Sequence, residues 1–424
     1  MIGSGGREHA LVWKLAQSPL AEKIFALPGN PGISELAECV DSIKASDHNA
    51  VIDFARRNSI ELVVIGPEAP LVEGLADDLS AAGIKVFGPS KAAAQLEGSK
   101  IFAKQLMKKY GIPTARHEIF SDAEAARNYV RNEGAPIVVK ADGLAAGKGV
   151  IVAQSIDEAI AAIDEIMEQK VFGAAGNRVV IEEFMDGEEA SLLAFTDGKT
   201  VLPMIPSQDH KRVNDGDRGL NTGGMGSYAP APIVDQNVLH AAVEKILKPT
   251  IEAMSNEGMP YRGCLYAGLM IVDGEPKVVE FNARFGDPET QVVLPLLQSD
   301  LVELMLACAD GTLDKQSIEW RDESAVCIIL ASGGYPQSYK KGLPIDGIAK
   351  AKSLGALIFH AGTTMRDGKL LTSGGRVLGV VSLDQNLRTA VDKAYKAVSV
   401  INFENMHFRK DIAARALRRL DDNV

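Results

Sequence analysis

A carboxylate and a carboxamide stand two residues apart in the segment KVVEFNARFGDPETQ (277–291). Side chains of a strand alternate between its two faces, so we expect Glu280 and Asn282 to share one face and Val279 and Phe281 to share the other. Two hard oxygen ligands in a row suit Mg²⁺ that bridges nucleotide phosphates. An edge strand with a polar outer face would explain the alternation, but not the run of polar residues that follows.

The residues directly after this strand offer a cation, an accessible backbone N–H group and a second carboxylate. These are Arg284, Gly286 and Asp287. Phosphoryl transfer asks a protein for charge and positioning more than for covalent chemistry, and these groups beside a metal site supply both. The segment therefore predicts phosphoryl transfer.

The segment VVKADGLAAGKGVIVA (138–153) has the pattern of two strands joined by a Gly-rich loop. It is not a Walker A loop, because its glycines are one residue too close, a glycine replaces the hydroxyl residue and a strand follows. We predict instead a mobile hairpin laid over phosphates, with Gly143, Gly147 and Lys148 in the loop. Lys140 ends the first apolar strand, where an ammonium group needs an anion.

The segment VVIEEFMDGEE (179–189) leads an apolar strand into a run of carboxylates. A strand edge can offer backbone groups to an adenine ring, and a carboxylate several residues later can bind ribose hydroxyls. A solvated acidic turn would give the same pattern, so both interpretations stay open at this point.

The chain opens with MIGSGGREHA, a Gly-rich turn before a helical pattern. Gly3 and Gly5 fit a dinucleotide fingerprint, but Glu8 takes the place of its third glycine and the next strand ends without a carboxylate, so a nicotinamide site is excluded. The free N–H groups of such a turn attract anions, and Arg7 can add a bidentate contact. A plain tight turn is the alternative.

Only two residues, Met1 and Ile2, precede this turn, whereas a strand is normally about five residues long. Either the start codon was assigned downstream of the true start, or the sheet tolerates a stub. An upstream extension of about five apolar residues is expected to stabilise the chain.

The segment SQDHKRVNDGDRGLNTGGMG (207–226) is long, polar and rich in glycine. Loops of this length inside compact domains are usually functional or disordered, and glycines let the backbone approach a ligand closely. The candidate residues of this loop are Asp209, Lys211, Asn221, Thr222, Gly223 and Gly224.

Three parts of the chain have to bring these segments together. Residues 1–98 alternate short apolar runs with helical stretches, PLVEGLADDLSAAG (70–83) among them, which predicts a parallel sheet covered on both faces. Residues 99–320 hold a lysine-rich helix, a smaller α/β piece at about 115–186 and antiparallel hairpins. Residues 321–424 form an α+β region. The predicted fold is thus a multidomain α/β and α+β protein.

Three Asp-Gly pairs between apolar runs mark tight hairpin turns, the strongest short signal for this structure. They are Asp197-Gly198, Asp273-Gly274 and Asp367-Gly368. A helix that starts near Ser99 is expected to end at Gly111.

Composition excludes several classes of protein. The net charge of -11, without a long basic tract, argues against nucleic-acid binding. The four cysteines lie far apart, as expected of reduced thiols in the cytoplasm rather than of a disulfide framework or a zinc site. No apolar run reaches about 18 residues and the start does not resemble a signal peptide, so we expect neither membrane insertion nor secretion.

In this order the parts resemble the ATP-grasp superfamily of carboxylate–amine ligases. Within it, the motifs GGREHAL, GPEAPL, EGSK, KADGLAAGKGV, SQDHKR, NTGGMG and EFNARFGDPETQ are similar to those of the glycinamide ribonucleotide synthetase (phosphoribosylamine–glycine ligase) family. The resemblance runs over essentially the whole chain, and RFGDPE is its most specific motif.

The resemblance implies a reaction. ATP phosphorylates the carboxylate of glycine, and the amine of 5-phosphoribosylamine then attacks the glycyl phosphate to give glycinamide ribonucleotide, ADP and phosphate, the second step of de novo purine biosynthesis. Another ATP-grasp ligase, such as a nucleotide carboxylase, and a non-catalytic nucleotide-binding module are the alternatives. We expect a cytoplasmic monomer with small-molecule substrates and no nucleic-acid partner.

The resemblance also implies a nucleotide site and a metal site. Glu280 and Asn282 would bind the metal, Mg²⁺ or Mn²⁺. Lys100 and Lys140, with Lys104 as a further candidate, would bind the ATP phosphates under a lid at 143–149. Glu182, Glu183 and Phe184 would line the adenine, and Glu189 would bind the ribose.

The remaining implied roles concern catalysis and the other two substrates. Arg284 and Gly286 would stabilise the transferring phosphoryl group and the acyl oxyanion, and Asp209 and Asp287 would handle amino groups. Gly5, Gly6, Arg7 and Glu68 would bind the ribose phosphate and its hydroxyls. The polar loop would complete the substrate site with Lys211, Asn221, Thr222, Gly223 and Gly224.

Overall fold

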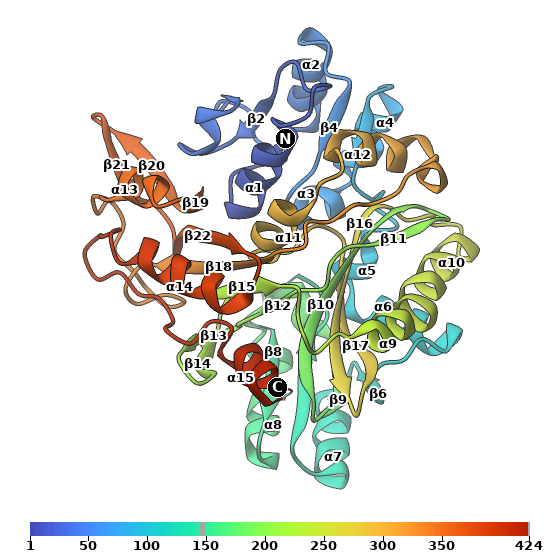
Figure 1. Ribbon diagram of the computed structural model, residues 1–424. Helices are drawn as coiled ribbons and strands as arrows, with labels where there is room; N and C mark the ends of the chain where they lie inside the picture. The colour runs from blue at the N-terminus through green and yellow to red at the C-terminus, as the bar shows by residue number, and fades with distance from the viewer. Residues whose placement is uncertain (145–148, 423–424) are drawn as a thin grey trace.

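The structure is a computed structural model that describes residues 1–144 and 149–422, and it has three regions arranged around one junction (Figure 1). Within these described residues, no helix combines the length and the apolar character that a membrane crossing needs. The predicted multidomain α/β architecture is confirmed.

The N-terminal region is a parallel sheet in the order β3-β2-β1-β4-β5, because a bridge between Ile2 and Ile65 joins β1 to β4. The two-residue strand β1 lies in the middle, and its backbone is paired on both sides: Leu27 N–H donates to Met1 C=O and Gly66 N–H donates to Ile2 C=O, at 2.9 and 3.0 Å. The strands are β1 (Ile2–Gly3), β2 (Phe25–Pro28), β3 (Glu38–Cys39), β4 (Leu62–Val64) and β5 (Lys85–Phe87).

Helices cover this sheet, and one predicted helical stretch is divided. Residues 70–83 contribute to two helices rather than one, since Gly74 has a φ of +102° that interrupts the helical backbone. The helices are α1 (Gly6–Leu15), α2 (His48–Arg57), α3 (Glu68–Glu73), α4 (Leu75–Ala81) and α5 (Gln95–Gly98).

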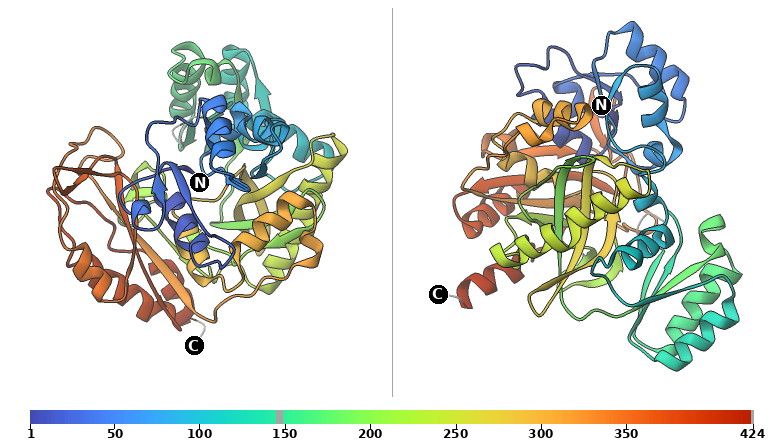
Figure 2. Two further views of the ribbon diagram at one scale, coloured as in Figure 1. Left: turned by 90° about the horizontal axis from the view of Figure 1, so that it is seen from above. Right: turned by 90° about the vertical axis from the view of Figure 1, so that its right-hand side faces the viewer.

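The central region begins with α6 (Lys100–Tyr110), which ends at Gly111 as predicted. A small antiparallel sheet, in the order β6-β9-β7-β8, then projects from the body of the molecule (Figure 2, right). Its elements are β6 (His117–Phe120), α7 (Ala123–Glu133), β7 (Ile137–Ala141), β8 (Val150–Ala153), α8 (Ile156–Ile163) and β9 (Val179–Glu183).

A larger antiparallel sheet in the order β11-β10-β16-β17 follows. The predicted turns at Asp197-Gly198 and Asp273-Gly274 are confirmed, since they join β10 to β11 and β16 to β17. Helices α9 (Gln236–Ala242), α10 (Lys248–Asn256), α11 (Thr290–Leu296) and α12 (Leu301–Asp310) accompany it. The strands are β10 (Glu188–Asp197), β11 (Val201–Pro203), β16 (Arg262–Val272) and β17 (Glu275–Asn282).

A bulge in β17 changes the predicted alternation. Gly268 pairs with Glu280 and Leu269 with Val278, so Val279 is an extra residue in the ladder. The prediction that Val279 and Phe281 share a face was therefore wrong: Val278 and Phe281 are buried, whereas Val279 is half-buried and lines a cavity. The bulge restores the register beyond it, so Glu280 and Asn282 still lie on either side of buried Phe281.

The C-terminal region is built on a five-stranded antiparallel sheet to which the polar loop of the central region contributes two strands. Asp367-Gly368 forms the third predicted turn, between β20 and β21. The sheet order is β12 (Gln208–Asp209), β15 (Gly226–Ala229), β18 (Ser324–Ala331), β22 (Arg376–Asp384) and β19 (Leu357–His360). The other elements are β13 (Arg212–Asn214), β14 (Arg218–Asn221), α13 (Ile348–Ser353), β20 (Thr363–Arg366), β21 (Lys369–Thr372), α14 (Leu387–Val398) and α15 (Ala414–Asp422).

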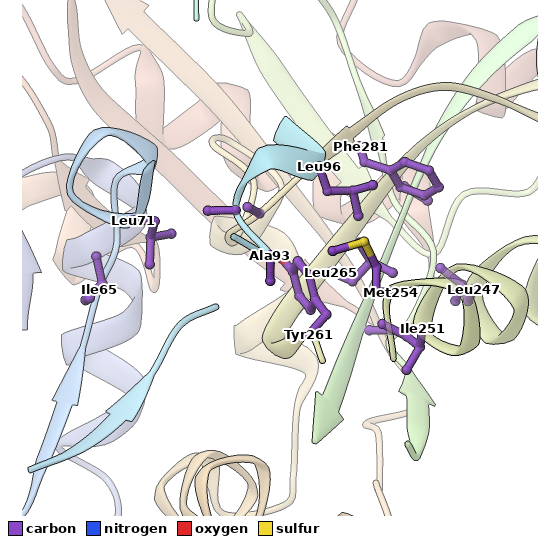
Figure 3. Close-up of a cluster of buried hydrophobic side chains, with 14 of the residues drawn as sticks. Ile65, Leu71, Ala93, Leu96, Leu247, Ile251, Met254, Tyr261, Leu265 and Phe281 are labelled. Atoms are coloured by element: carbon purple, nitrogen blue, oxygen red, sulfur yellow. The ribbon is translucent and has the colours of Figure 1, made fainter. Parts of the chain in front are cut away.

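One apolar cluster runs from the N-terminal sheet into the large antiparallel sheet and fixes the two regions against each other. Figure 3 shows Ile65 and Leu71 at one end, Ala93 and Leu96 in the middle, and Leu247, Ile251, Met254, Tyr261, Leu265 and Phe281 at the other end. A shared, close-packed core resists small displacements, so the loops above it are held in register.

The junction also depends on two glycines. Gly263, at the start of β16, has a φ of +121°, and a Cβ built there would lie 3.2 Å from the backbone of Gly88. We predict that Gly263→Ala lowers the free energy of unfolding by about 2 kcal/mol, because it combines backbone strain with overpacking. Gly83→Ala is the matched control, since Gly83 also has a positive φ but faces open space. Equal shifts of the two thermal midpoints would contradict the importance of the close approach.

Candidate functional site

One cavity of about 760 Å³ lies where the three regions meet. Its walls come from the opening loop, α6, β7, β8, the segment after β9, the polar loop, β17 and the start of β22. The predicted site residues that line it are Arg7, Glu68, Lys100, Lys104, Lys140, Gly143, Glu182, Glu183, Phe184, Glu189, Asp209, Lys211, Asn221, Thr222, Gly223, Glu280, Asn282, Arg284 and Asp287.

The other predicted residues lie behind the wall or beyond what the structure describes. Gly224 backs onto Pro288 so closely that a Cβ would collide with it, and Gly286 backs onto Glu289 in the same way. Gly5 and Gly6 lie behind Arg7 at the start of α1. Two residues of the predicted phosphate hairpin, Gly147 and Lys148, lie outside the described residues.

A carboxylate and two lysines are buried together where α6, β7 and β9 line the cavity. Glu182 lies 2.9 Å from both Lys104 and Lys140. Lys104 also donates to Thr114 at 2.7 Å, and Lys140 donates to the carbonyl of Val279, the bulged residue of β17, at 3.0 Å. The Glu182 carboxylate, which is predicted to line the adenine, holds two cations in place.

The pKa values of this group follow from burial and pairing. Burial lowers the pKa of Lys104 to about 8, against the opposing effect of the Glu182 charge. Burial acts to raise the pKa of Glu182, but Lys140 and Lys104 together lower it. At neutral pH the carboxylate is therefore ionised, and Lys104 is close to losing its proton.

A second lysine contact fixes the base of the β7–β8 hairpin. Lys100 donates to the carbonyl of Gly143 at 2.9 Å. Asp142 accepts from the Ser99 hydroxyl, the Ile101 N–H group and Arg178 at 2.9, 3.2 and 2.7 Å, respectively. The N-terminus of α6 and the described end of the hairpin thus form one unit.

The predicted metal strand faces the same lysines. Burial acts to raise the pKa of Glu280, but the charges of Lys211, Lys140 and Lys100 lower it, so the carboxylate is ionised. Among the described residues no group of three or more acidic, His or Cys side chains is placed to hold a metal. A carboxylate and an amide oxygen fit a hard cation that completes its shell with phosphate oxygens and water.

Arg284 lies half-buried between two carboxylates of the N-terminal region. Its guanidinium group is 3.3 Å from Glu68 and 3.0 Å from Glu97, and Glu97 also accepts from the Ala283 N–H group at 2.6 Å. Burial alone would lower the pKa of Arg284, but Glu97 and Glu68 raise it. The sequence did not predict Glu97, because the contact spans 186 positions of the chain.

Asp287 connects the opening loop to the C-terminal region. Its carboxylate lies 3.1 Å from Arg376 and accepts from Gln291 at 2.7 Å. Burial acts to raise its pKa, but Arg376 and Arg7 lower it. Arg376 also donates to the carbonyls of Gly223 and Asp287 at 2.6 and 2.8 Å, so a residue that sequence patterns did not single out joins three walls of the cavity.

The opening loop differs from the prediction of a free anion-binding turn. The Gly5 N–H group donates to Glu8 at 2.6 Å, so the residue that breaks the dinucleotide fingerprint caps α1 instead. The other oxygen of Glu8 lies 2.6 Å from Arg7, and Arg7 donates to the carbonyl of Phe285 at 3.2 Å. The guanidinium group is therefore oriented toward the segment after β17.

The polar loop brings a lysine to the ribose side of the cavity. Lys211 forms a 2.5 Å ion pair with Glu189. Burial raises the pKa of the neighbouring Asp209 to about 7, against the opposing charge of Lys211. Glu289 accepts from Tyr266 and Ser191 at 3.0 and 3.1 Å. Glu289 was missed although it lies in the polar run after β17, and Tyr266 had no sequence signal.

Comparisons with known proteins agree with this geometry. Three family descriptions of phosphoribosylglycinamide synthetase match the chain: the N domain over 1–97, the ATP-grasp (A) domain over 98–290 and the C domain over 325–415. A phosphoribosylamine–glycine ligase of Rhizobium meliloti (strain 1021) is 53% identical over 419 residues, 99% of this chain and 98% of that protein.

Solved structures show the same fold. The crystal structure of phosphoribosylamine–glycine ligase from Thermotoga maritima superposes with a TM-score of 0.86 at 36% identity, covering 97% of this chain and 99% of that one. The biotin carboxylase domain of Hydrogenobacter thermophilus 2-oxoglutarate carboxylase, in complex with MgADP and bicarbonate, has a TM-score of 0.72 at 15% identity and covers 96% and 90% of the two chains. The second likeness concerns the fold alone.

The lysine–carboxylate group gives a test of the site electrostatics. We predict that Glu182→Gln destabilises the chain by about 3 kcal/mol at pH 7, because two buried ammonium groups lose their shared partner. A lysine whose pKa is lowered in the folded state gains stability as pH rises from about 8 toward its ordinary value of 10.5, and removal of Glu182 lowers that pKa further. The difference between wild type and variant should therefore shrink at pH 9.

Urea unfolding at the two pH values measures this difference, and Glu183→Gln on the same strand is the matched control because Glu183 is only half-buried. A difference that does not change with pH would contradict the assigned pairing.

Proposed function

The chain belongs to the phosphoribosylglycinamide synthetase family, and from that premise we propose how its cavity divides between ATP and the two other substrates. The chain is an ATP-dependent ligase of purine biosynthesis that joins glycine to phosphoribosylamine. The observation that carries the proposal is that one cavity brings together the lysine–carboxylate group at Glu182, Glu280 and Asn282 of β17, and the side chains of Arg7 and Asp287.

The nucleotide half lies between the small antiparallel sheet and β17. Lys100 and Lys140 bind the phosphates of ATP, and Lys104 supports them through Glu182. The segment after β9, with Glu183 and Phe184, forms the adenine side, and Glu189 meets the ribose. Support for this assignment comes from the burial of Lys140 and from the contacts of Lys100 and Lys140 with the carbonyls of Gly143 and Val279.

A divalent cation, Mg²⁺ or Mn²⁺, belongs at Glu280 and Asn282. Bound there, it would bridge phosphate oxygens and offset their negative charge. This assignment rests on the ionised state of Glu280 and on its place next to the lysines.

The acceptor half lies between the opening loop and the C-terminal region. Arg7 and Glu68 meet the phosphate and hydroxyls of phosphoribosylamine, with the Gly5-Gly6 turn behind them. Glycine lies near Asp209, Asp287 and the backbone of Asn221 to Gly224. The contacts of this part of the cavity support the division, since Arg7 donates to the carbonyl of Phe285 and Asp287 pairs with Arg376, whereas Lys104 and Lys140 pair with Glu182.

In the reaction, a carboxylate oxygen of glycine attacks the γ-phosphorus of ATP, the bond to the β-phosphate oxygen breaks and ADP leaves. The amine of phosphoribosylamine attacks the carbonyl carbon of glycyl phosphate, inorganic phosphate leaves and the nitrogen gives up a proton. Arg284 is oriented by Glu68 and Glu97 to offset charge on the phosphoryl group, and the Gly286 N–H group is assigned to the acyl oxyanion.

The nearest alternative reaction uses bicarbonate instead of glycine to accept the phosphoryl group of ATP. ADP release that requires glycine and phosphoribosylamine, and does not occur with bicarbonate, is the expected result. The chain is also expected to act as a cytoplasmic monomer without a nucleic-acid partner, which gel filtration and nucleic-acid titration would test.

Loss of the metal carboxylate should abolish ligation without unfolding the chain. We predict that Glu280→Gln lowers turnover at limiting Mg²⁺ by about 10²-fold or more, because a hard cation loses its charged ligand. Glu275→Gln, at the exposed start of the same strand, is the control. Unchanged turnover of Glu280→Gln would contradict a metal site on this strand.

A change in the opening loop should weaken the binding of one substrate only. We predict that Arg7→Ala raises the KM for phosphoribosylamine about tenfold or more and leaves the KM values for ATP and glycine near those of wild type, because the contact serves substrate binding. Arg57→Ala, on the exposed face of α2, is the control. A rise in the KM for ATP that equals or exceeds the rise for phosphoribosylamine would place Arg7 in the nucleotide half.

A further inference from the structure

We propose that Arg409, near the C-terminus, is a positioning residue for glycine, because it holds the hairpin β13–β14 whose base forms part of the acceptor wall. The inference rests on the proposed function, since it assigns glycine to that wall. Figure 1 shows α15 beside this hairpin, although the two are far apart in the sequence.

The base of the hairpin belongs to the cavity. Lys211 precedes β13, and Asn221 ends β14. The Thr222 N–H group donates to the carbonyl of Lys211 at 2.8 Å, and the Thr222 hydroxyl donates to the same oxygen at 2.8 Å. Any rotation of the hairpin about its base therefore moves Lys211, Asn221 and Thr222, which all line the cavity.

The tip of the hairpin is held from outside by the C-terminal segment. Asp217 lies 2.9 Å from Arg409 and 3.0 Å from Arg415. Two backbone contacts accompany these ion pairs: the Gly216 N–H group donates to Asp411 at 2.8 Å, and the Lys410 N–H group donates to Asp215 at 2.8 Å. The tip of a hairpin is ordinarily among the most mobile parts of a chain, so these four contacts restrict motion that would reach the cavity.

Arg409 is the centre of this arrangement. Its side chain is 0% exposed, and all three guanidinium nitrogens donate: two to Asp411 at 2.7 and 2.8 Å, and the third to Asp217 and to the carbonyl of Arg212 at 2.9 and 3.1 Å. A lysine cannot make this planar set of contacts. Unlike Asp217 and Arg415, Arg409 does not line the cavity, so its influence on a substrate has to pass through the hairpin.

The same C-terminal segment contacts the nucleotide wall through a different residue. Arg419 forms a 2.7 Å ion pair with Glu188, next to the ribose residue Glu189. Within the residues that the structure describes, the Arg409 side chain contacts Asp411, Asp217 and the carbonyl of Arg212, and it does not pair with Glu188, Lys100 or Lys140. The base of the hairpin reaches the nucleotide wall through one side-chain ion pair, Lys211 with Glu189, so a change at Arg409 is expected to act mainly on the acceptor wall and to affect the binding of ATP less than that of glycine.

The test uses the full chain and steady-state assays of ADP release. We expect Arg409→Lys, which keeps the charge and loses the fork, to raise the KM for glycine about fivefold or more while the KM for ATP stays within about twofold of wild type. Backbone hydrogen exchange over 212–224 should become faster in the variant. Arg418→Gln is the matched control, because Arg418 is exposed on α15, and it should change neither quantity.

Asp217→Asn provides a second variant in case Arg409→Lys does not fold. Asp217 has a φ of +55°, which asparagine tolerates, so the backbone is preserved while the charge is removed. The same rise in the KM for glycine and the same faster exchange are expected, with partial loss only in Arg415→Lys, which keeps its charge.

Three results would overturn the inference: kinetics unchanged in Arg409→Lys and Asp217→Asn, equal rises in the KM values for ATP and glycine, or a raised KM without faster exchange over 212–224. Absence of glycine-dependent ADP release in the wild-type chain would be a failure of the proposed function instead, and hydrogen exchange would still report whether Arg409 holds the hairpin.

Discussion

A guanidinium group that is largely withdrawn from water has to be paired, and in this chain the partners of Arg284 lie in a different region of the fold. Arg284 follows β17, whereas Glu68 and Glu97 belong to the N-terminal region. Glu97 is the better shielded partner, with 7% of its side chain exposed against 34% for Glu68, so its removal would cost more than the loss of an exposed ion pair. This pairing fixes where the metal strand meets the parallel sheet, and the apolar cluster below it makes the same junction rigid.

The remaining charges of the cavity follow the same rule. Glu182 forms ion pairs with Lys104 and Lys140, Glu189 with Lys211, and Asp287 with Arg376. Lys140, Lys211 and Arg284 are thus each paired with a carboxylate, and Lys100 is held by the carbonyl of Gly143, so these cations are oriented before a ligand binds. Such preorganisation matters for phosphoryl transfer, in which the protein contributes chiefly positioned charge.

Local patterns predicted much of the fold and of the site. The three Asp-Gly turns, the end of α6 at Gly111 and the placement of Glu280, Asn282 and Lys140 in one cavity follow from residue types a few positions apart. The bulge at Val279 was not predicted, because it depends on how β17 pairs with β16. The contact of the Gly5 N–H group with Glu8 was also missed, although the two residues are only three positions apart.

Glu97 and Arg376 were not predicted for a different reason. Their contacts with Ala283 and Asp287 span 186 and 89 positions, and no spacing rule connects residues that only the tertiary fold brings together. The same holds for Arg409, whose partner Asp217 lies 192 positions away. Candidate residues within short motifs could thus be named from the sequence, whereas residues that only the tertiary fold brings to them, such as Arg376 and Arg409, could not.

The division of the cavity into a nucleotide half and an acceptor half is tested most directly by hydrogen exchange of the wild-type chain with one ligand at a time. ADP with Mg²⁺ should slow exchange over β7 to β9 and over β17, and leave the opening loop and residues 221–229 unchanged. Glycinamide ribonucleotide should slow exchange in the opening loop and over 221–229, and leave β7 to β9 unchanged. Protection of the opening loop by ADP, or of β7 to β9 by glycinamide ribonucleotide, would contradict the division.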